Sequence, residues 1–246
     1  MRSVSVLDLT VRRDGAMLLD GVRFAAGGGE FVGVIGPNGA GKSTLLRAIA
    51  GLESAASGAV TIDGAPVAAM APLARARTLA FLPQAREVHW AITAEAVVSL
   101  GRFAYGEGRR LGPADRAAVD AALAATDAMS FRTRVASSLS GGELARIHVA
   151  RALAADTAIL VADEPTAALD LKHALAVMAS LRAKAEAGGT VIAALHDLAL
   201  ARRFCTRIIV LDRGRIEADG APPDSPSDEL IARVFGVGAD DLRRFA

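Results

Sequence analysis

The chain has 246 residues, which is enough for one large domain or two small ones with an ample hydrophobic core. Its formal net charge is +1, so we expect no broad electrostatic attraction to nucleic acid and no nucleic-acid partner. No uninterrupted apolar stretch reaches about 18 residues, the length that predicts a membrane-spanning helix. Cys205 is the only cysteine, which excludes an internal disulfide and suits a reducing compartment, so we expect a cytoplasmic protein.

The beginning of the chain has the alternation of a half-exposed sheet. Residues 3–12 alternate polar and apolar side chains, which predicts a strand and not a secretory signal. Asp63 and Gly64 lie between the apolar segment 60–62 and Val67, a spacing typical of a hairpin. The first third of the chain is therefore predicted to be partly antiparallel.

Three other segments are short, continuous apolar runs, each followed by polar residues or glycine. Such runs suit parallel strands that helices bury on both faces. The runs are Phe31–Ile35, Ile159–Ala162 and Val191–Leu195, and helical patterns occupy Ser43–Ala50, Gly142–Ala155 and Leu169–Ala187. This alternation of strand and helix predicts an α/β core.

Residues from about 88 to 140 break the alternation. They contain the Ala-rich helical pattern Pro113–Thr126 and no convincing strand, which predicts a helical subdomain inserted into the core. A second hairpin is expected around Asp212–Gly214, followed by a loop and a short terminal helix. We therefore expect a single domain over residues 1–246, whose core spans about 1–87 and 156–246 and whose helical part spans about 88–155.

The segment after the first apolar run matches the phosphate-loop pattern G-x-x-x-x-G-K-[ST]. The matching residues are Gly36, Pro37, Asn38, Gly39, Ala40, Gly41, Lys42, Ser43 and Thr44. Glycines let the backbone fold tightly enough to present closely spaced N–H groups to phosphates, and the helix that follows adds its positive end. We expect Lys42 to reach the β- and γ-phosphates, the Ser43 hydroxyl to bind Mg²⁺, and Thr44 to contact the α-phosphate.

The alternative to a functional phosphate loop is a chance match, which arises in on the order of one chain in a hundred. Here an apolar strand precedes the pattern and a helix follows it, which is the context that the motif requires. We therefore predict that the chain binds ATP with Mg²⁺ and hydrolyses it.

Polar residues also follow other predicted strands at their carboxyl ends, where ligands bind in open α/β sheets. Asp163 and Glu164 follow one strand, His196 follows another, and Gln84 ends a short expected strand. Asp163 is suited to holding Mg²⁺, and Glu164 is suited to polarising the attacking water. Acidic residues after a strand also cap helices, but Pro165 and the second carboxylate make capping a poor account of both. His196 and Gln84 are weaker signals when taken alone.

A further pair of glycines lies at the start of a predicted helix. Ser140 and Glu143 have the spacing of a capping box, which by itself explains the serine and the glutamate. Capping does not explain Gly141 and Gly142, because glycines disfavour a helical turn, whereas their bare backbone N–H groups suit a phosphate. Since Gly36–Thr44 already supplies one phosphate cradle, the second element is predicted to serve another subunit.

The order of these motifs resembles that of the ATP-binding-cassette (ABC) ATPases over nearly the whole chain. The matching elements are GPNGAGKST at 36–44, Gln84, LSGGE at 139–143, ILVADEPT at 159–166, Leu169-Asp170 and His196. The LSGGE element is specific to that group. The resemblance implies an α/β phosphate-loop core of mainly parallel strands with flanking helices, an N-terminal antiparallel β subdomain and an inserted α-helical subdomain.

The same resemblance implies a homodimer in which two copies pack head to tail. ATP would lie between the phosphate loop of one copy and Ser140–Glu143 of the other, and Asp170 would cross the interface. His196 would contact the γ-phosphate, so that it joins Glu164 in the catalytic set. Gln84 would belong both to this set and to the Mg²⁺ ligands, and would link the site to a membrane partner.

Segments outside the shared motifs are similar to the ATPases that import ferric siderophores, haem or vitamin B12. These segments are Val98–Arg102, Ser140–Leu153, His196–Gly214 and Val234–Val237. The resemblance implies the ATPase subunit of such an importer, with haem as our first choice of substrate. Its partners would be two transmembrane permease subunits and, indirectly, an extracytoplasmic solute-binding protein. It would lie peripherally on the cytoplasmic face of the cell membrane.

Three residues depart from the pattern of the ABC ATPases. Members of the family usually stack the adenine on an aromatic residue after the first strand, and Arg13 occupies that position here. A guanidinium can stack on a base, but Arg13 as a solvated strand residue is an equal alternative. Glu143 replaces the commoner glutamine, and Ala167 lacks a hydroxyl that often lies three residues before Asp170.

The competing class of function is a soluble ABC-type ATPase that acts in assembly or regulation. Translation factors of this kind usually carry two cassettes in one chain, and the present chain has one phosphate loop. DNA-repair members need a long coiled-coil insertion, which does not fit between residues 88 and 140. The transport function therefore remains the leading hypothesis.

Overall fold

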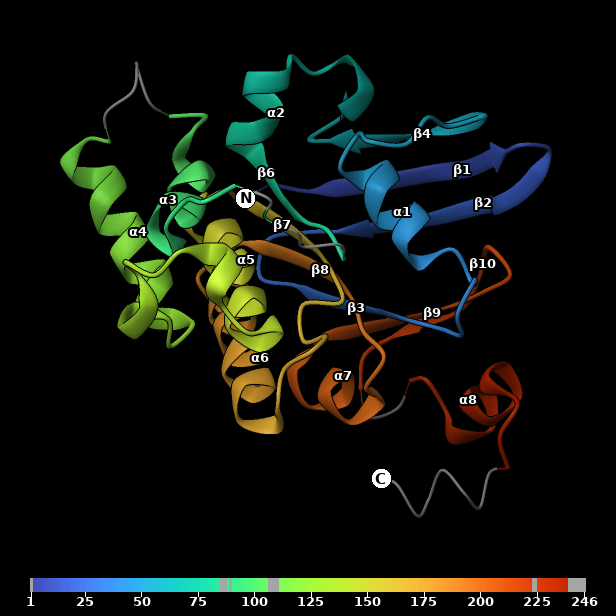
Figure 1. Ribbon diagram of the computed structural model, residues 1–246. Coiled ribbons are helices and arrows are strands. Elements are labelled where there is room, and N and C mark those ends of the chain that lie inside the picture. Colours follow the sequence, from blue (N-terminus) through green and yellow to red (C-terminus); the bar gives the residue numbers. More distant parts are fainter. Residues whose placement is uncertain (1, 85–87, 89, 106–110, 223–224, 239–246) are drawn as a thin grey trace.

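The computed structural model describes residues 2–84, 88, 90–105, 111–222 and 225–238. Two sheets lie side by side, an antiparallel one in the order β2-β1-β4-β5 and a larger one in the order β10-β9-β3-β8-β7-β6 (Figure 1). The strands are β1 (Val4–Arg13), β2 (Ala16–Ala26), β3 (Phe31–Ile35), β4 (Ser57–Ile62), β5 (Ala65–Pro66), β6 (Leu79–Leu82), β7 (Ile159–Asp163), β8 (Thr190–Ala194), β9 (Arg207–Asp212) and β10 (Arg215–Gly220).

Helices cover both faces of the larger sheet. They are α1 (Lys42–Ile49), α2 (Pro72–Thr78), α3 (Ala94–Ser99), α4 (Pro113–Ala125), α5 (Gly141–Ala154), α6 (Leu171–Glu186), α7 (Leu198–Phe204) and α8 (Asp228–Phe235). Short 3₁₀ turns lie at Val67–Ala69, Leu100–Arg102, Met129–Phe131 and Ala136–Ser138. None of the helices in the described part of the chain is long and apolar enough to cross a bilayer.

The strands β3, β8 and β7 pair in parallel at the centre of the larger sheet and are buried over their whole length. Alternate residues of β3 face opposite layers. Val32 and Val34 pack with α1 and the antiparallel sheet, whereas Phe31 and Ile35 pack with α5, α6 and α7. This burial from both sides explains the continuous apolar runs, whose predicted bounds are confirmed to within one residue at each end.

The helices α3, α4 and α5 form a third layer of packing, on the left of Figure 1. Val97, Leu123 and Ile147 share its hydrophobic cluster. Among the described residues between 88 and 140, strand-like pairing is limited to the isolated bridge Thr93–Val135. The helical character expected there is confirmed, while the division of the chain near residues 88 and 155 stays a prediction.

Local differences from the predicted elements have simple causes. The hairpin turn at Asp63 and Gly64 is confirmed, but Val67 begins a 3₁₀ turn, because Pro66 has no N–H group with which to continue the ladder. The helix expected from Leu169 begins at Leu171, because Asp170 acts as its N-cap. The short helix α2 was not predicted.

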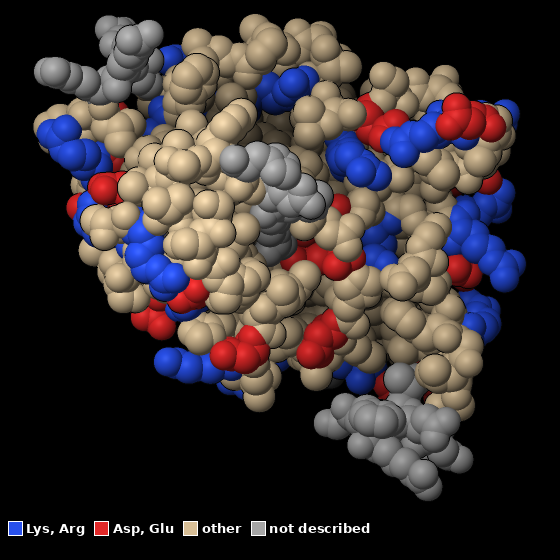
Figure 2. Space-filling view, viewed as in Figure 1, with Lys and Arg blue, Asp and Glu red and all other residues tan. Residues whose placement is uncertain are grey.

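Charged side chains do not gather into one broad patch on the face shown in Figure 2. Lysine and arginine residues are more frequent along the right edge, and elsewhere both signs occur in small groups separated by larger uncharged areas. This distribution agrees with the net charge of +1. An anion that binds on this side must therefore be held by specific groups and not by a broad positive electrostatic potential.

Candidate functional site

The loop between β3 and α1 has a conformation that requires glycine at two positions. A Cβ at Gly36 would lie 2.0 Å from the carbonyl oxygen of Leu211, and one at Gly41 would lie 2.7 Å from that of Leu18. Both glycines have positive φ angles, +155° and +104°. Gly41 precedes α1 and offers no side chain to cap it, so the first N–H groups of the helix are available to an anion.

Lys42 folds back over this loop. Its Nζ donates hydrogen bonds to the carbonyl oxygens of Gly36 at 2.6 Å and Pro37 at 3.0 Å. Burial lowers the pKa of Lys42, and the nearby carboxylates of Glu164 and Asp163 act in the opposite direction. The ammonium group is thus held beside the glycine-rich backbone, with acidic residues of a different strand close to it.

Asp163 ends β7 beside the phosphate loop. The residue is buried, with only 3% of its surface exposed. Burial raises the pKa of this carboxyl, whereas the hydrogen bond with the Ser43 side chain and the charges of Arg47 and Lys42 lower it. A hydroxyl oxygen and a carboxylate therefore lie together, a pair of hard donors of the kind that Mg²⁺ prefers.

Glu164 follows Asp163 in a backbone conformation that is unusual for a residue with a side chain. Its φ angle is +52°, and its N–H donates to the carbonyl oxygen of Ala194 at 3.2 Å. Its Oε1 lies 2.5 Å from Nε2 of His196, which follows β8. Strained conformations of this kind persist where the surrounding structure holds them, and they gather at functional sites.

Lys42, Glu164 and His196 line one cleft of about 640 Å³, whereas the buried Asp163 is not among its lining residues. Its lining residues are Arg13, Leu18, Asn38, Gly39, Ala40, Gly41, Lys42, Ser43, Thr44, Gln84, Glu164 and His196. The structure thus brings the phosphate loop together with Gln84, Glu164 and His196, which come from the carboxyl ends of three other strands. Their individual roles in binding and hydrolysis stay predictions.

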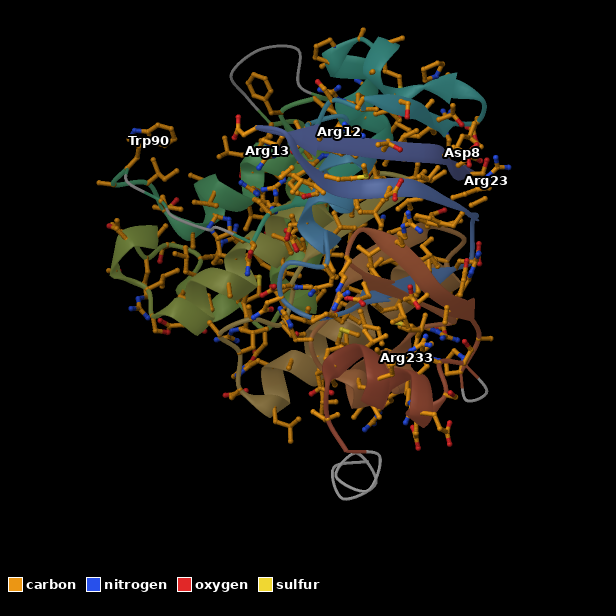
Figure 3. The ribbon with its side chains drawn as sticks, turned by 90° about the vertical axis from the view of Figure 1, so that its right-hand side faces the viewer. Asp8, Arg12, Arg13, Arg23, Trp90 and Arg233 are labelled. Atoms are coloured by element: carbon orange, nitrogen blue, oxygen red, sulfur yellow. The ribbon has the colours of Figure 1, made fainter. Side chains whose placement is uncertain are left out.

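Arg13 lies at the end of β1 and reaches the same cleft. Its guanidinium pairs with the carboxylate of Glu53, whose side chain is 15% exposed. Figure 3 shows Arg13 next to Arg12 on this strand, with Trp90 well away from both at the left edge of the view. Trp90 is 72% exposed and is not among the residues that line the cleft.

The second glycine pair lies away from this cleft. Ser140 caps α5, and its N–H donates to Glu143 Oε2 at 2.8 Å, which confirms the capping box. A Cβ at Gly141 would meet no atom within 4 Å, so the backbone there is open to an incoming group. None of the residues Ser140–Glu143 belongs to the cleft lining among the described residues.

Asp170 also lies outside the cleft. Its side chain is 65% exposed and accepts a hydrogen bond from the N–H of His173 at 2.9 Å. Two residues of the site were not anticipated from the sequence, Leu18 in the cleft wall and Glu53 beside Arg13. Neither carries a local sequence signal, because each reaches the site only through the pairing of distant segments.

The family model of the ABC transporter matches residues 19–167. The hemin import ATP-binding protein HmuV of Nocardia farcinica is 45% identical over 218 residues, which cover 89% of this chain and 75% of the relative. HmuV of Pseudomonas entomophila is 41% identical, with coverage of 95% and 92%. The cobalamin import ATP-binding protein BtuD of Halobacterium salinarum is also 41% identical, over 97% of this chain and 61% of its own length.

Solved structures share the fold. The dimeric ATP-binding cassette MJ0796, in a post-hydrolysis state with ADP and Pi bound, has a TM-score of 0.81 and 32% identity. The match covers 89% of this chain and 98% of that one. An ATP binding subunit of an ABC transporter also has a TM-score of 0.81, at 26% identity, and covers 98% of this chain and 97% of its own. The fold class expected from the sequence is confirmed.

Proposed function

The chain belongs to the ABC transporter family, and from this premise we propose that it is the ATP-hydrolysing subunit of an importer. The cargo is an iron-containing or corrinoid chelate, with haem as the first candidate, because the relatives named above import hemin or cobalamin. The soluble alternative, an ATPase of assembly or regulation, has no support among those relatives.

One observation carries the proposal. The phosphate loop shares a cleft with Gln84, Glu164 and His196, whereas Ser140–Glu143 face elsewhere. A phosphate-binding loop with an acidic residue and a histidine beside it suits hydrolysis of a nucleotide. The remote glycine pair is then left to complete the site of a second copy, and a homodimer contains two such composite sites.

The donors beside the loop fit Mg²⁺, since a hydroxyl and a carboxylate lie together there. Ser43, Asp163 and Gln84 would hold the ion, which when bound supplies positive charge against the phosphates. Lys42 exchanges the loop carbonyls for phosphate oxygens, and Glu164 orients the attacking water and accepts its proton. His196 fixes the Glu164 carboxylate and faces the γ-phosphate.

Transport requires partners that this chain does not supply. Two permease subunits span the membrane, and a solute-binding protein delivers the chelate from outside the cell. The chain is peripheral to the membrane, and we place it on the cytoplasmic face, where ATP is available. Binding of ATP closes the dimer and hydrolysis reopens it, which moves the permease subunits between two conformations.

The decisive experiment is affinity purification of the tagged chain from detergent-solubilised membranes of its native cell. We expect it to bring down two hydrophobic permease subunits, with ATPase activity in the complex. Recovery only from the soluble fraction, without hydrophobic partners, would contradict the importer. Uptake of haem, cobalamin and ferric siderophores into vesicles that contain the complex then identifies the cargo.

A further inference from the structure

One histidine ties the start of α6 to the end of α4. Oδ1 of Asp170, the N-cap of α6, lies 2.7 Å from Nδ1 of His173, in addition to its bond with the backbone N–H of the same residue. The other ring nitrogen, Nε2, lies 3.7 Å from Oδ2 of Asp127, just after α4. The imidazole is 23% exposed and stands between carboxylates of two different elements.

Asp127 is in turn held by α5. Nη1 of Arg146 donates to the Asp127 carbonyl oxygen at 2.6 Å and to its Oδ2 at 3.3 Å. The Arg146 guanidinium, itself 10% exposed, lies 4.8 Å from the centre of the Phe131 ring. A second link joins α6 to α4, since the Ser180 hydroxyl of α6 donates to the carbonyl oxygen of Ala125, the last residue of α4, at 3.0 Å. The Asp127 side chain is 68% exposed, and its carboxylate is oriented by Arg146 on one side and His173 on the other.

The segment 164–170 between β7 and α6 contains two residues in unusual backbone conformations. Glu164 and Ala168 have φ angles of +52° and +64°, which are costly for residues with a Cβ. The carbonyl oxygen of Ala168 lies so close to α5 that a Cβ at Gly142 would be 3.1 Å from it. The segment thus contacts the start of α5, and it ends at Asp170, whose carboxylate contacts the His173 ring.

We propose that His173 is a positioning residue that bridges Asp170 and Asp127 and thereby fixes the segment 164–170 against the helical part of the chain. It acts on hydrolysis through the two ends of this segment, Glu164 and Asp170. The inference rests on the proposed function, which gives those two residues their roles in the ATP site and at the dimer interface.

The bridge is complete only when the imidazole is protonated. A cationic imidazole donates to Asp170 through Nδ1 and attracts the Asp127 carboxylate 3.7 Å from Nε2, whereas a neutral ring keeps only a hydrogen bond with Asp170. The charged groups in contact with it are Asp170 from the start of α6 and Asp127 from the end of α4. Lys172 acts on the Asp170 carboxylate, and Arg146 of α5 donates to that of Asp127. The contribution of His173 to turnover is therefore expected to be largest at low pH and to decline as pH rises.

The first test measures kcat and KM for ATP in His173→Ala and His173→Asn between about pH 6 and 8.5. Alanine should lower kcat about threefold to tenfold at pH 6 with KM unchanged, and the loss should shrink at high pH. Asparagine places an N–H donor near the Nδ1 position, so it can bond to Asp170 but not reach Asp127. It should match the wild type at high pH and fall below it at pH 6. Glu186→Gln, at the exposed far end of the same helix, is the control.

The second test needs no activity. Hydrogen exchange of the amides in segment 164–170 should be faster in His173→Ala than in the wild type and unchanged in Glu186→Gln. A wild-type chain that neither hydrolyses ATP nor dimerises defeats the proposed function, while this exchange measurement still tests the bridge. An active wild type whose His173→Ala variant keeps its kcat, pH profile and exchange rates overturns the inference. A loss of kcat that is equal at every pH also overturns it.

Discussion

His196 and Glu164 join the carboxyl ends of two neighbouring strands, because Nε2 of the histidine lies 2.5 Å from Oε1 of the glutamate. The glutamate side chain is 14% exposed and the histidine 47%, and both line the cleft at the phosphate loop. The histidine therefore holds the carboxylate in the wall of the cleft. This geometry suits a general base whose direction must be fixed before a water molecule can be activated.

Replacing Glu164 with glutamine should abolish turnover without loss of ATP binding. The amide keeps the shape of the side chain but cannot accept the proton, and a general base contributes about 10²–10⁴-fold to rate. We expect kcat to fall at least about a hundredfold and the ATP-bound dimer to accumulate in size-exclusion chromatography. Glu186→Gln, on the exposed face of α6, is the control. A fully active Glu164→Gln variant would show that the base lies elsewhere.

Replacing Ser140 with alanine should impair hydrolysis while the monomer still binds nucleotide. The loss of the cap on α5 costs about 1 kcal/mol by itself, so stability must be separated from catalysis. Ser227→Ala is a matched control, because Ser227 caps α8 in the same way and lies outside the proposed site. Equal turnover in the two variants would contradict a composite site, and lower turnover only in Ser140→Ala would support it.

Local sequence patterns were sufficient for the elements that depend on local chemistry. The phosphate loop needs glycines where the backbone approaches Leu211 and Leu18, and those glycines are visible in the motif itself. The capping box at Ser140 likewise involves residues three apart. The continuous apolar run of β3 was predictive because helices and a second sheet bury both of its faces.

Contacts between distant segments were not predictable in this way. Arg13 pairs with Glu53, which lies 40 positions away in the sequence. His173 approaches Asp127, which lies 46 positions away. No periodicity or motif marks such partners. Helix α2 was missed for a related reason, since its 7 residues are held against β6 by tertiary packing and have little helical pattern of their own.

Cys205 should behave as an inert buried thiol up to high pH. Burial raises its pKa to about 12, from an ordinary value of 9.0. The unfolded chain loses this proton first as pH rises, so the folded state binds more protons above about pH 9, and stability must fall there. The free energy of unfolding of the wild type, measured in urea, should therefore drop more between pH 8.5 and 10.5 than that of Cys205→Ala, by up to about 1.4 kcal/mol per pH unit. Identical pH profiles in the two proteins would show that the thiol does not contribute.

The Cys205 side chain leaves no room for a side chain at Gly33 in β3. A Cβ at this position would lie 2.7 Å from Cys205 Sγ and 3.4 Å from Leu195 Cδ1, and both neighbours are packed in the core. Gly33→Ala should therefore destabilise the fold by about 1–3 kcal/mol in urea unfolding, since a rigid core cannot accept an added methyl group without strain. Gly27→Ala is the control, because its nearest atom, Glu30 Oε2, would be 3.7 Å away.

A double-mutant cycle separates this contact from a general intolerance of alanine in β3. Removing Sγ opens the space that the new methyl group needs, so the Gly33→Ala/Cys205→Ala protein should be more stable than Gly33→Ala alone. Contacting core residues couple by about 0.5–3 kcal/mol in such cycles. If the two destabilisations instead simply add, the strain arises from the β3 backbone or from Leu195, and the thiol is not what excludes a side chain at Gly33.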